Sequence, residues 1–244
     1  MRSRSSRGIV RRGTSDGSTS FNTTLWATWN PNVTWADVKV GDFNGDGGAD
    51  ITGRFQQGGS WWTGISNGTG FTTSQWAAWN PAATWVDVNV GDFNGDGKSD
   101  IVGRWLQGGQ WFVGQSSSTS FDTTLWETWN PNVTWADVRV GDFNGDGKSD
   151  IIGRWQQAGI WYVGTSTGTS FNTTAWASWN PNVTWTDIIV GDFNGDGKSD
   201  IAERYLQGGQ WYTGISSGTN FTTTLWDTWS PAVNWTDVQL MKSV

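Results

Sequence analysis

A strict 50-residue repeat constrains this chain more than any other feature of its sequence. The segment VGDFNGDG occurs four times, beginning at Val40, Val90, Val140 and Val190. A period of this length is typical of solenoids and β-propellers, in which each unit buries its faces against its neighbours. We therefore expect one domain over residues 1–244, built from repeats at 1–50, 51–100, 101–150, 151–200 and 201–244.

Each repeat contains four short segments with strand character. In one complete repeat they cover about residues 84–93, 100–106, 110–116 and 121–126, with Gly, Asn, Asp, Ser or Pro between them. A helical period of 3.6 residues is absent from these segments. The pattern predicts an all-β fold, a β-propeller of five four-stranded blades.

The length of the chain predicts how the last blade is completed. Five periods of 50 residues would need 250, and the chain has 244. The deficit corresponds to GDGKSD at 195–200, so both ends fall inside what would be a fifth acidic loop. We expect the N-terminal residues to supply three strands of this blade and residues 235–240 the fourth, which would cover exposed sheet edges. A monomer is expected, and a strand-swapped oligomer stays open because a split blade can also close between two chains.

Composition excludes several classes of function. The chain has no Cys and no His, which excludes disulfides, thiolate or imidazole catalysis, and ordinary zinc, copper or haem sites. The net charge is −7 and the one basic run lies at the N-terminus, so a nucleic-acid partner is not expected. No segment approaches the roughly 20 apolar residues that insert into a membrane. Residues 1–7, within the basic run, are expected to be partly disordered, and no signal peptide is readable.

The acidic loops carry the clearest chemistry. In residues 92–100, oxygen-bearing side chains occupy loop positions 1, 3, 5 and 9, Gly97 at position 6 permits a sharp turn, and position 7 offers a backbone carbonyl. Such oxygen donors suit calcium, and without a cation the carboxylates would repel one another. A plain turn is the alternative, but it needs no Asp at position 9. We expect four calcium ions, held by Asp42, Asn44, Asp46, Gly48 and Asp50; Asp92, Asn94, Asp96, Lys98 and Asp100; Asp142, Asn144, Asp146, Lys148 and Asp150; and Asp192, Asn194, Asp196, Lys198 and Asp200.

The motif VGDFNGDGKSDI resembles the FG-GAP or VCBS-type repeat of integrin-α-like propellers, over essentially the whole chain. In that family the loop is a calcium-binding β-hairpin, which implies ligand roles for Asp42, Asn44, Asp46 and Asp50 and for their equivalents. The Trp-rich pattern LWxTWNPxVTWxDV resembles bacterial surface or secreted members, which implies a secreted or cell-surface setting. Two departures stand out: the family's propellers usually have seven blades, and residues 241–244 do not continue the fifth loop.

Tryptophans recur in two kinds of position. Three per repeat, such as Trp76, Trp79 and Trp85, are predicted to pack between blades, because burying rings of this size contributes energy on the scale of a core. A fourth precedes another aromatic residue in each repeat, and neighbours on a strand point to opposite faces. One of each such pair is predicted to line a cleft between blades where a sugar ring stacks. The candidate glycan-binding residues are Trp61, Trp111, Trp161 and Trp211.

Other polar residues recur with the same period. Arginines at 54, 104, 154 and 204 accompany aspartates at 37, 87, 137, 187 and 237, which predicts ion pairs that fix the geometry of each blade. Glutamines at 57, 107, 157 and 207 either contact a glycan hydroxyl or face a turn.

These features together predict a calcium-binding β-propeller that acts as an extracellular binding or adhesion module, with glycans or cell-surface proteins as partners. Lectin-like binding at repeated clefts is one hypothesis, and a structural or protein-docking propeller is the other. Catalysis is not expected, because it usually needs one asymmetric constellation of residues. The acids that do not repeat are scattered: Asp16, Asp122, Glu127, Glu203 and Asp227.

Overall fold

The computed structural model describes residues 8–15, 21–233 and 235, and the regular structure in them is entirely β-strand. The repeats explain this, because short runs of β-branched and aromatic residues are interrupted by Gly, Asn, Asp and Pro, which favour turns. No helix in this part of the chain is long and apolar enough to cross a membrane. The all-β prediction is confirmed.

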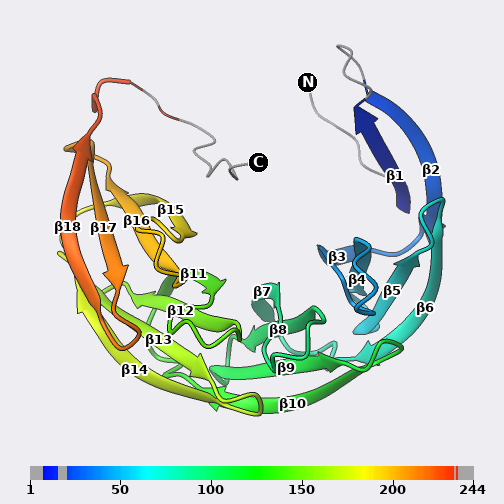
Figure 1. Cartoon of the computed structure of the whole chain (residues 1–244). Coiled ribbons are helices and arrows are strands. Elements are labelled where there is room, and N and C mark those ends of the chain that lie inside the picture. The colour runs from blue at the N-terminus through cyan, green and yellow to red at the C-terminus, as the bar shows by residue number, and fades with distance from the viewer. Residues whose placement is uncertain (1–7, 16–20, 234, 236–244) are drawn as a thin grey trace. The chain divides into compact units, whose positions relative to one another are not determined.

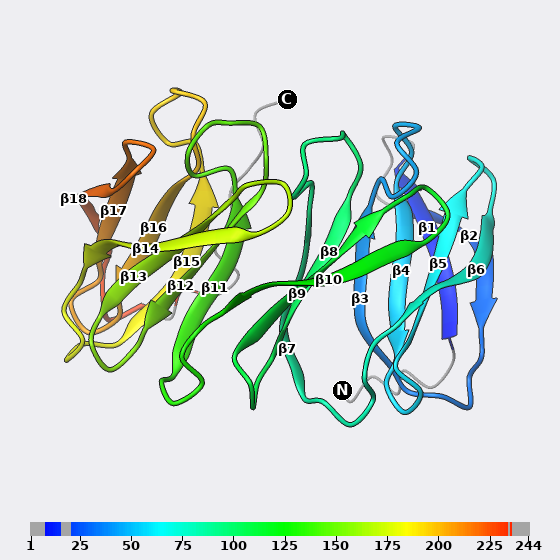
Figure 2. The same ribbon diagram turned by 90° about the horizontal axis from the view of Figure 1, so that it is seen from below.

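Four repeats each form a four-stranded sheet in which consecutive strands are neighbours (Figure 1). The view in Figure 2 shows the strands of each sheet joined as a meander. The sheets contain β3 (Trp35–Gly41), β4 (Asp50–Phe55), β5 (Ser60–Ser66) and β6 (Phe71–Ala78); β7 (Trp85–Gly91), β8 (Asp100–Trp105), β9 (Gln110–Ser116) and β10 (Phe121–Thr128); β11 (Trp135–Gly141), β12 (Asp150–Trp155), β13 (Ile160–Ser166) and β14 (Phe171–Ser178); and β15 (Trp185–Gly191), β16 (Asp200–Tyr205), β17 (Gln210–Ser216) and β18 (Phe221–Thr228). Repeated antiparallel sheets of this kind are blades of a propeller-like fold.

The remaining repeat does not form the predicted fifth blade. Its described strands, β1 (Gly8–Ser15) and β2 (Phe21–Trp29), pair as a two-stranded antiparallel sheet, so the described residues contain four four-stranded blades rather than five. By the repeat period, β1 and β2 correspond to the third and fourth strands of a blade. The first two strands of every complete blade are joined through the acidic loop. Residues 1–7 and 236–240, which were assigned to this blade, lie outside the described residues.

The chain divides into two compact units, which we describe separately. The first contains Met1–Val90, Gly97–Gln107 and Phe112–Thr124, and the second contains Gly91–Asp96, Gly108–Trp111 and Leu125–Val244. The first unit includes sheet β3–β6, and the second includes sheets β11–β14 and β15–β18. The single domain expected over residues 1–244 stays a prediction.

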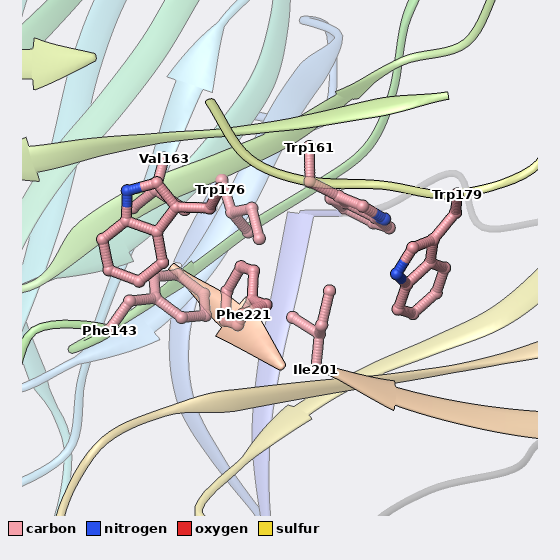
Figure 3. Packing of buried hydrophobic residues seen from close by; sticks show 8 residues of the cluster. Phe143, Trp161, Val163, Trp176, Trp179, Ile201 and Phe221 are labelled. Atoms are coloured by element: carbon pink, nitrogen blue, oxygen red, sulfur yellow. The ribbon is translucent and has the colours of Figure 1, made fainter. Parts of the chain in front are cut away.

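The core of the second unit lies between sheets β11–β14 and β15–β18. Trp161 and Trp179 pack edge-on with ring centroids 5.5 Å apart, and Phe221 of β18 contacts Trp176 at 5.1 Å and Phe143 at 5.9 Å (Figure 3). These edge-to-face contacts are an arrangement that aromatic rings prefer. The two sheets therefore pack against each other largely through aromatic side chains.

The first unit repeats this packing and confirms the role predicted for the tryptophan trio. Trp76 and Trp79 are buried in its core, and Trp85 packs against them partly buried. The indole Nε1 of Trp79 donates to the Thr123 hydroxyl, 3.1 Å away on β10, which ties one blade to the following one. Inter-blade packing is the function of these rings.

Candidate functional site

The acidic loop between β3 and β4 is built around the carboxylate of Asp42. Its Oδ1 accepts the amide of Gly45 at 2.7 Å, and its Oδ2 accepts the amide of Gly47 at 2.8 Å. Both glycines have positive φ, 80° and 83°, a conformation that glycine adopts without strain. The repeated Gly-Asp-Gly sequence therefore folds the loop back onto its first aspartate.

The structure brings three of the four predicted side-chain ligands of this loop together and separates the fourth. Asn44 donates from Nδ2 to Asp46 Oδ2 at 2.8 Å and accepts the Asp46 amide at 3.0 Å. Asp50 turns into the blade instead, where it is 1% exposed and accepts the amides of Phe43 at 3.0 Å and Ser66 at 2.8 Å. Asp50 thus ties the loop to the end of β5.

The same division is visible in the electrostatics of the loops. The side chain of Asn44 and the amide of Gly48 donate hydrogen bonds that lower the pKa of Asp46. Burial raises the pKa of Asp50, and it raises the pKa of its equivalent Asp150 to about 7. In the first loop, hydrogen bonds therefore favour the charged form of Asp46, and burial penalises the charged form of Asp50.

A lysine at position 7 distinguishes the later loops from the first. Lys148 Nζ lies 2.8 Å from Asp146 Oδ2, and Lys198 Nζ lies 3.1 Å from Asp196 Oδ2, whereas the first loop has Gly48 at this position. Within the described ranges, no group of three or more acidic side chains is arranged to hold a metal ion. The oxygen donors suit a hard cation by their chemistry, and Asp42, Asn44 and Asp46 are the ones that lie together.

The acidic loops have a second role that the sequence analysis missed, which is to dock one blade on the following one. In the first unit, the Ser99 amide donates to the Asp42 carbonyl at 2.7 Å, and the Ser116 hydroxyl donates to the Phe43 carbonyl at 2.5 Å. Ser166 and Ser216 make the equivalent bonds in the second unit, to Phe93 and Phe143 at 2.6 Å. The periodic serine at the end of the third strand was the signal for this contact.

The predicted arginine–aspartate pairs are confirmed in each complete blade. Arg54, Arg104 and Arg204 each place Nη2 2.6 Å from their aspartates, and Arg154 pairs with Asp137 in the same way. The aspartates sit where the first two strands shift register, and Asp37 has a φ of 53°. A buried guanidinium therefore holds a locally strained residue at the start of each blade. Asp237 lies outside the described residues.

The repeated glutamines face turns rather than an open site. Gln57 donates from Nε2 to the Thr34 hydroxyl at 2.9 Å and accepts the Thr34 amide at 3.3 Å. Gln107, Gln157 and Gln207 bond the equivalent threonines. These amides fix the Asn-Pro turn that precedes each first strand.

The tryptophans predicted to bind glycans are core residues. Trp61, Trp111 and Trp161 are 0% exposed and Trp211 is 7% exposed, so no indole face remains for a sugar. The pairing register shifts between Trp61 and Trp62, and equally between Trp161 and Tyr162. The extra residue at this shift, Trp76 or Trp176, lies on the fourth strand, so the third strand keeps its alternation, with the first aromatic residue of each pair in the core and the second, on the other face, only partly covered.

The second aromatic residue of these pairs lines a recurrent pocket. Trp62 lines a pocket of about 400 Å³, Tyr162 one of about 340 Å³, and Tyr212 one of about 300 Å³. Each pocket lies between the Trp-Asn turn before a blade and the four strands of that blade. The equivalent walls are Trp29, Trp35, Phe55 and Thr73; Trp129, Trp135, Trp155 and Thr173; and Trp179, Trp185, Tyr205 and Thr223.

The polar groups of these pockets sit at the rim. The Nε1 of Trp135 donates a hydrogen bond to the Asn130 carbonyl at 3.0 Å, so the ring presents carbon atoms to the cavity. Trp129 Nε1 donates to Thr173 at 2.9 Å. Glu127 lines the pocket at Trp129, whereas its repeat equivalents Ala27 and Ala177 bring no charge. The pockets therefore share aromatic walls and differ in the charge at their rims.

Comparison with known families now decides the identity of the repeat. The profile of the FG-GAP-like repeat matches residues 42–103 and 142–202, which together make up half of the chain. The chain belongs to the FG-GAP-like repeat family. The matched segments run from the first aspartate of an acidic loop to the second strand of the following blade. No curated protein matches the chain.

Solved structures show a similar fold. A lectin of Agrocybe aegerita, described as recognising non-reducing terminal N-acetylglucosamine, is 17% identical with a TM-score of 0.68, and the match covers 90% of this chain and 62% of the lectin chain. The Tc holotoxin pore of Photorhabdus luminescens is 16% identical with a TM-score of 0.50, over 91% of this chain and 11% of the toxin chain. At these identities the likeness establishes a propeller-like fold and nothing further.

Proposed function

We propose that this FG-GAP repeat protein is an extracellular glycan-binding module whose sites are the three aromatic pockets. The observation that carries the proposal is their recurrence: three pockets of about 300–400 Å³, each with partly exposed aromatic rings and a polar rim. Ligand sites are commonly concave and mostly apolar, with a few polar groups that orient the ligand. A sugar ring offers the matching surfaces, with C–H groups for the rings and hydroxyls for the rim.

Two further points support this proposal. The similar Agrocybe aegerita protein is a lectin, and its described ligand supplies a first probe. Repetition also favours weak sites acting together, because several sites on one chain raise the avidity for a glycan-coated surface by about 10²–10⁴-fold without any new contact. A catalytic role has less support, since the acid at the rim of one pocket, Glu127, has no carboxylate counterpart in the other two.

The first test is binding of the protein to a surface coated with terminal N-acetylglucosamine. Replacing Trp62, Tyr162 and Tyr212 together by Ala should lower binding by about 100-fold or more, because avidity is lost with the sites. Any one replacement should remove one site per chain and leave the others. Leu125→Ala is the control, since Leu125 is 48% exposed and lines none of the three pockets.

The outcome separates the two candidate functions. Unchanged binding in the triple variant, with unchanged thermal unfolding, would exclude the pockets as glycan sites. Binding by neither protein to any sugar of a broad glycan array would favour the docking alternative, in which a cell-surface protein is the partner. In that case the partner would saturate at one site per chain rather than three.

We also propose that the acidic loops bind calcium, through Asp42, Asn44 and Asp46 in the first loop and the equivalent residues in the others. The oxygen-only donor set supports this proposal, and Gly48 makes the first loop the best candidate. In the third and fourth loops a lysine ammonium already neutralises the aspartate at position 5. A cation would have to displace that ammonium, which weakens its binding.

Calorimetric titration with calcium alone tests the loops. At a calcium concentration about 100 times the Kd, a bound ion should stabilise the fold by about 2.7 kcal/mol and raise the melting temperature. Asp42→Asn should remove the strongest site, and Lys148→Gly should strengthen the site at Asp142. A titration without heat and without a shift in melting temperature would show that the loops serve only as turns and blade contacts.

A further inference from the structure

Glu203 occupies a strand position that is glycine in the other three complete blades. The repeat equivalents in β4, β8 and β12 are Gly53, Gly103 and Gly153. A Cβ atom at these glycines would lie 2.7, 2.7 and 2.8 Å from the Cζ3 atom of the tryptophan that packs on it, closer than real Cβ contacts. Any side chain at position 203 must therefore displace a tryptophan.

Trp179 is the ring at this position, and its spacing differs from that of its equivalents. Its centroid lies 4.9 Å from Trp185, whereas Trp129 lies 4.4 Å from Trp135. It also lies 5.5 Å from Trp161, whereas the equivalent distance at Trp79 is 5.0 Å. The Glu203 side chain thus increases the spacing between Trp179 and its two neighbouring tryptophans. Trp179 and Trp185 also line the smallest of the three pockets.

The carboxyl group of Glu203 lies in the interior of the second unit. The residue is 0% exposed, and neither oxygen accepts a hydrogen bond from a described donor. Arg154 Nη2 lies 3.6 Å from Oε1, but that guanidinium already donates to Asp137. Arg139 also faces the group, while its Nη1 donates to the Val138 carbonyl at 2.8 Å.

This environment disfavours the ionised form of Glu203. Burial raises its pKa to about 9, and the neighbouring Asp137 carboxylate and a hydrogen bond to it act in the same direction, against smaller opposing effects of Arg154 and Arg139. Two ionised carboxylates are both acceptors, so a hydrogen bond between Glu203 and Asp137 requires a proton. Because Asp137 is more exposed and is paired with Arg154, the proton belongs on Glu203.

We propose that Glu203 is a neutral carboxylic acid that donates its proton to Asp137 and makes the junction between sheets β11–β14 and β15–β18 proton-linked. The unfolded chain releases this proton above the ordinary pKa of glutamic acid, whereas the folded chain keeps it up to a much higher pH. Stability at this junction is therefore greatest in mild acid and declines as the pH rises between those two values. No other complete blade has such an acid at this position.

The experiment is urea unfolding of the whole chain from pH 5 to pH 9, comparing the natural protein with Glu203→Gln and Glu203→Gly. Glutamine keeps the shape and a hydrogen-bond donor but cannot ionise, and glycine restores the residue of the other repeats. The unfolding constant of the natural protein, relative to either variant, should rise by about tenfold per pH unit above pH 5. Other titrating groups, Asp150 among them, are common to all three proteins and cancel in this ratio.

Two further measurements make the outcome decisive. Glu127→Gln is the matched control, because Glu127 is only partly buried. The unfolding constant of the natural protein relative to this variant should not vary with pH in this way. An infrared difference spectrum between the natural protein and Glu203→Gln at pH 7 should contain the carbonyl stretch of a protonated carboxylic acid. A pH-independent ratio for both Glu203 variants, or the absence of that band, would overturn the proposal.

Discussion

Gly159→Ala should destabilise the protein by about 4–5 kcal/mol, a large part of the stability of an ordinary domain. Gly159 has a φ of 68°, and a Cβ atom there would lie 1.9 Å from the Trp179 carbonyl oxygen. The Gly159 carbonyl accepts the Trp179 amide at 2.8 Å, and its own amide donates to Trp155 at 2.8 Å. Alanine therefore adds about 1–2 kcal/mol of left-handed strain and breaks the bonds that close the hairpin onto the Trp-Asn turn.

Gly147→Ala provides the matched control for this prediction. Gly147 has a φ of 84°, but nothing lies within 4 Å of a Cβ atom built on it. The substitution should cost about 1–2 kcal/mol, from backbone strain alone. Urea unfolding in the presence of a chelator measures both variants without a contribution from loop-bound cations. Equal losses of stability in the two variants would show that steric contact with Trp179 is not the reason why residue 159 must be glycine.

The blade itself could be predicted from the sequence because turn residues mark every strand end. The segment expected at 110–116 is β9, and the one expected at 100–106 is β8, which ends at Trp105. The fifth blade could not be predicted correctly, because a repeat period reports which residues are equivalent and not whether a sheet forms from separated segments.

The choice between neighbouring aromatics was beyond sequence reasoning for a different reason. Alternation places Trp61 and Trp62 on opposite faces, but the pattern does not tell which of the two faces is closed. Asp50 shows the same difficulty for an acid. Spacing alone cannot separate a metal ligand from a carboxylate that accepts two backbone amides.

Glu203 marks the opposite case, in which the sequence carried a signal that physical reasoning could have used. It was recognisable as an acid that the other repeats lack at this position. Its burial could be inferred only from the glycines at the equivalent positions. A glycine that recurs in the middle of a strand indicates close approach of another group. Replacing it with a glutamate therefore places a carboxyl group where a tryptophan ring packs in the other blades.

Trp176→Ala should cost about 3–5 kcal/mol of stability, whereas Trp226→Ala should cost less than about 1 kcal/mol. The two residues are repeat equivalents, but Trp176 is 5% exposed and Trp226 is 51% exposed. Trp176 packs on Phe221 of the following sheet at 5.1 Å, while Trp226 contacts Phe193 of its own sheet at 5.9 Å. Removing the Trp176 ring opens a cavity between sheets. Removing the Trp226 ring mainly reduces the apolar surface that is already in contact with solvent.

Urea unfolding of both variants at several protein concentrations tests this difference. The near-identical local sequences make each residue the control for the other, because helix or strand propensity changes by the same amount in both. A large loss for Trp226→Ala that does not depend on concentration would mean that another part of the same chain covers this ring in solution. A loss that grows as the protein concentration is raised would mean that a second copy covers it, because association stabilises the natural protein by mass action.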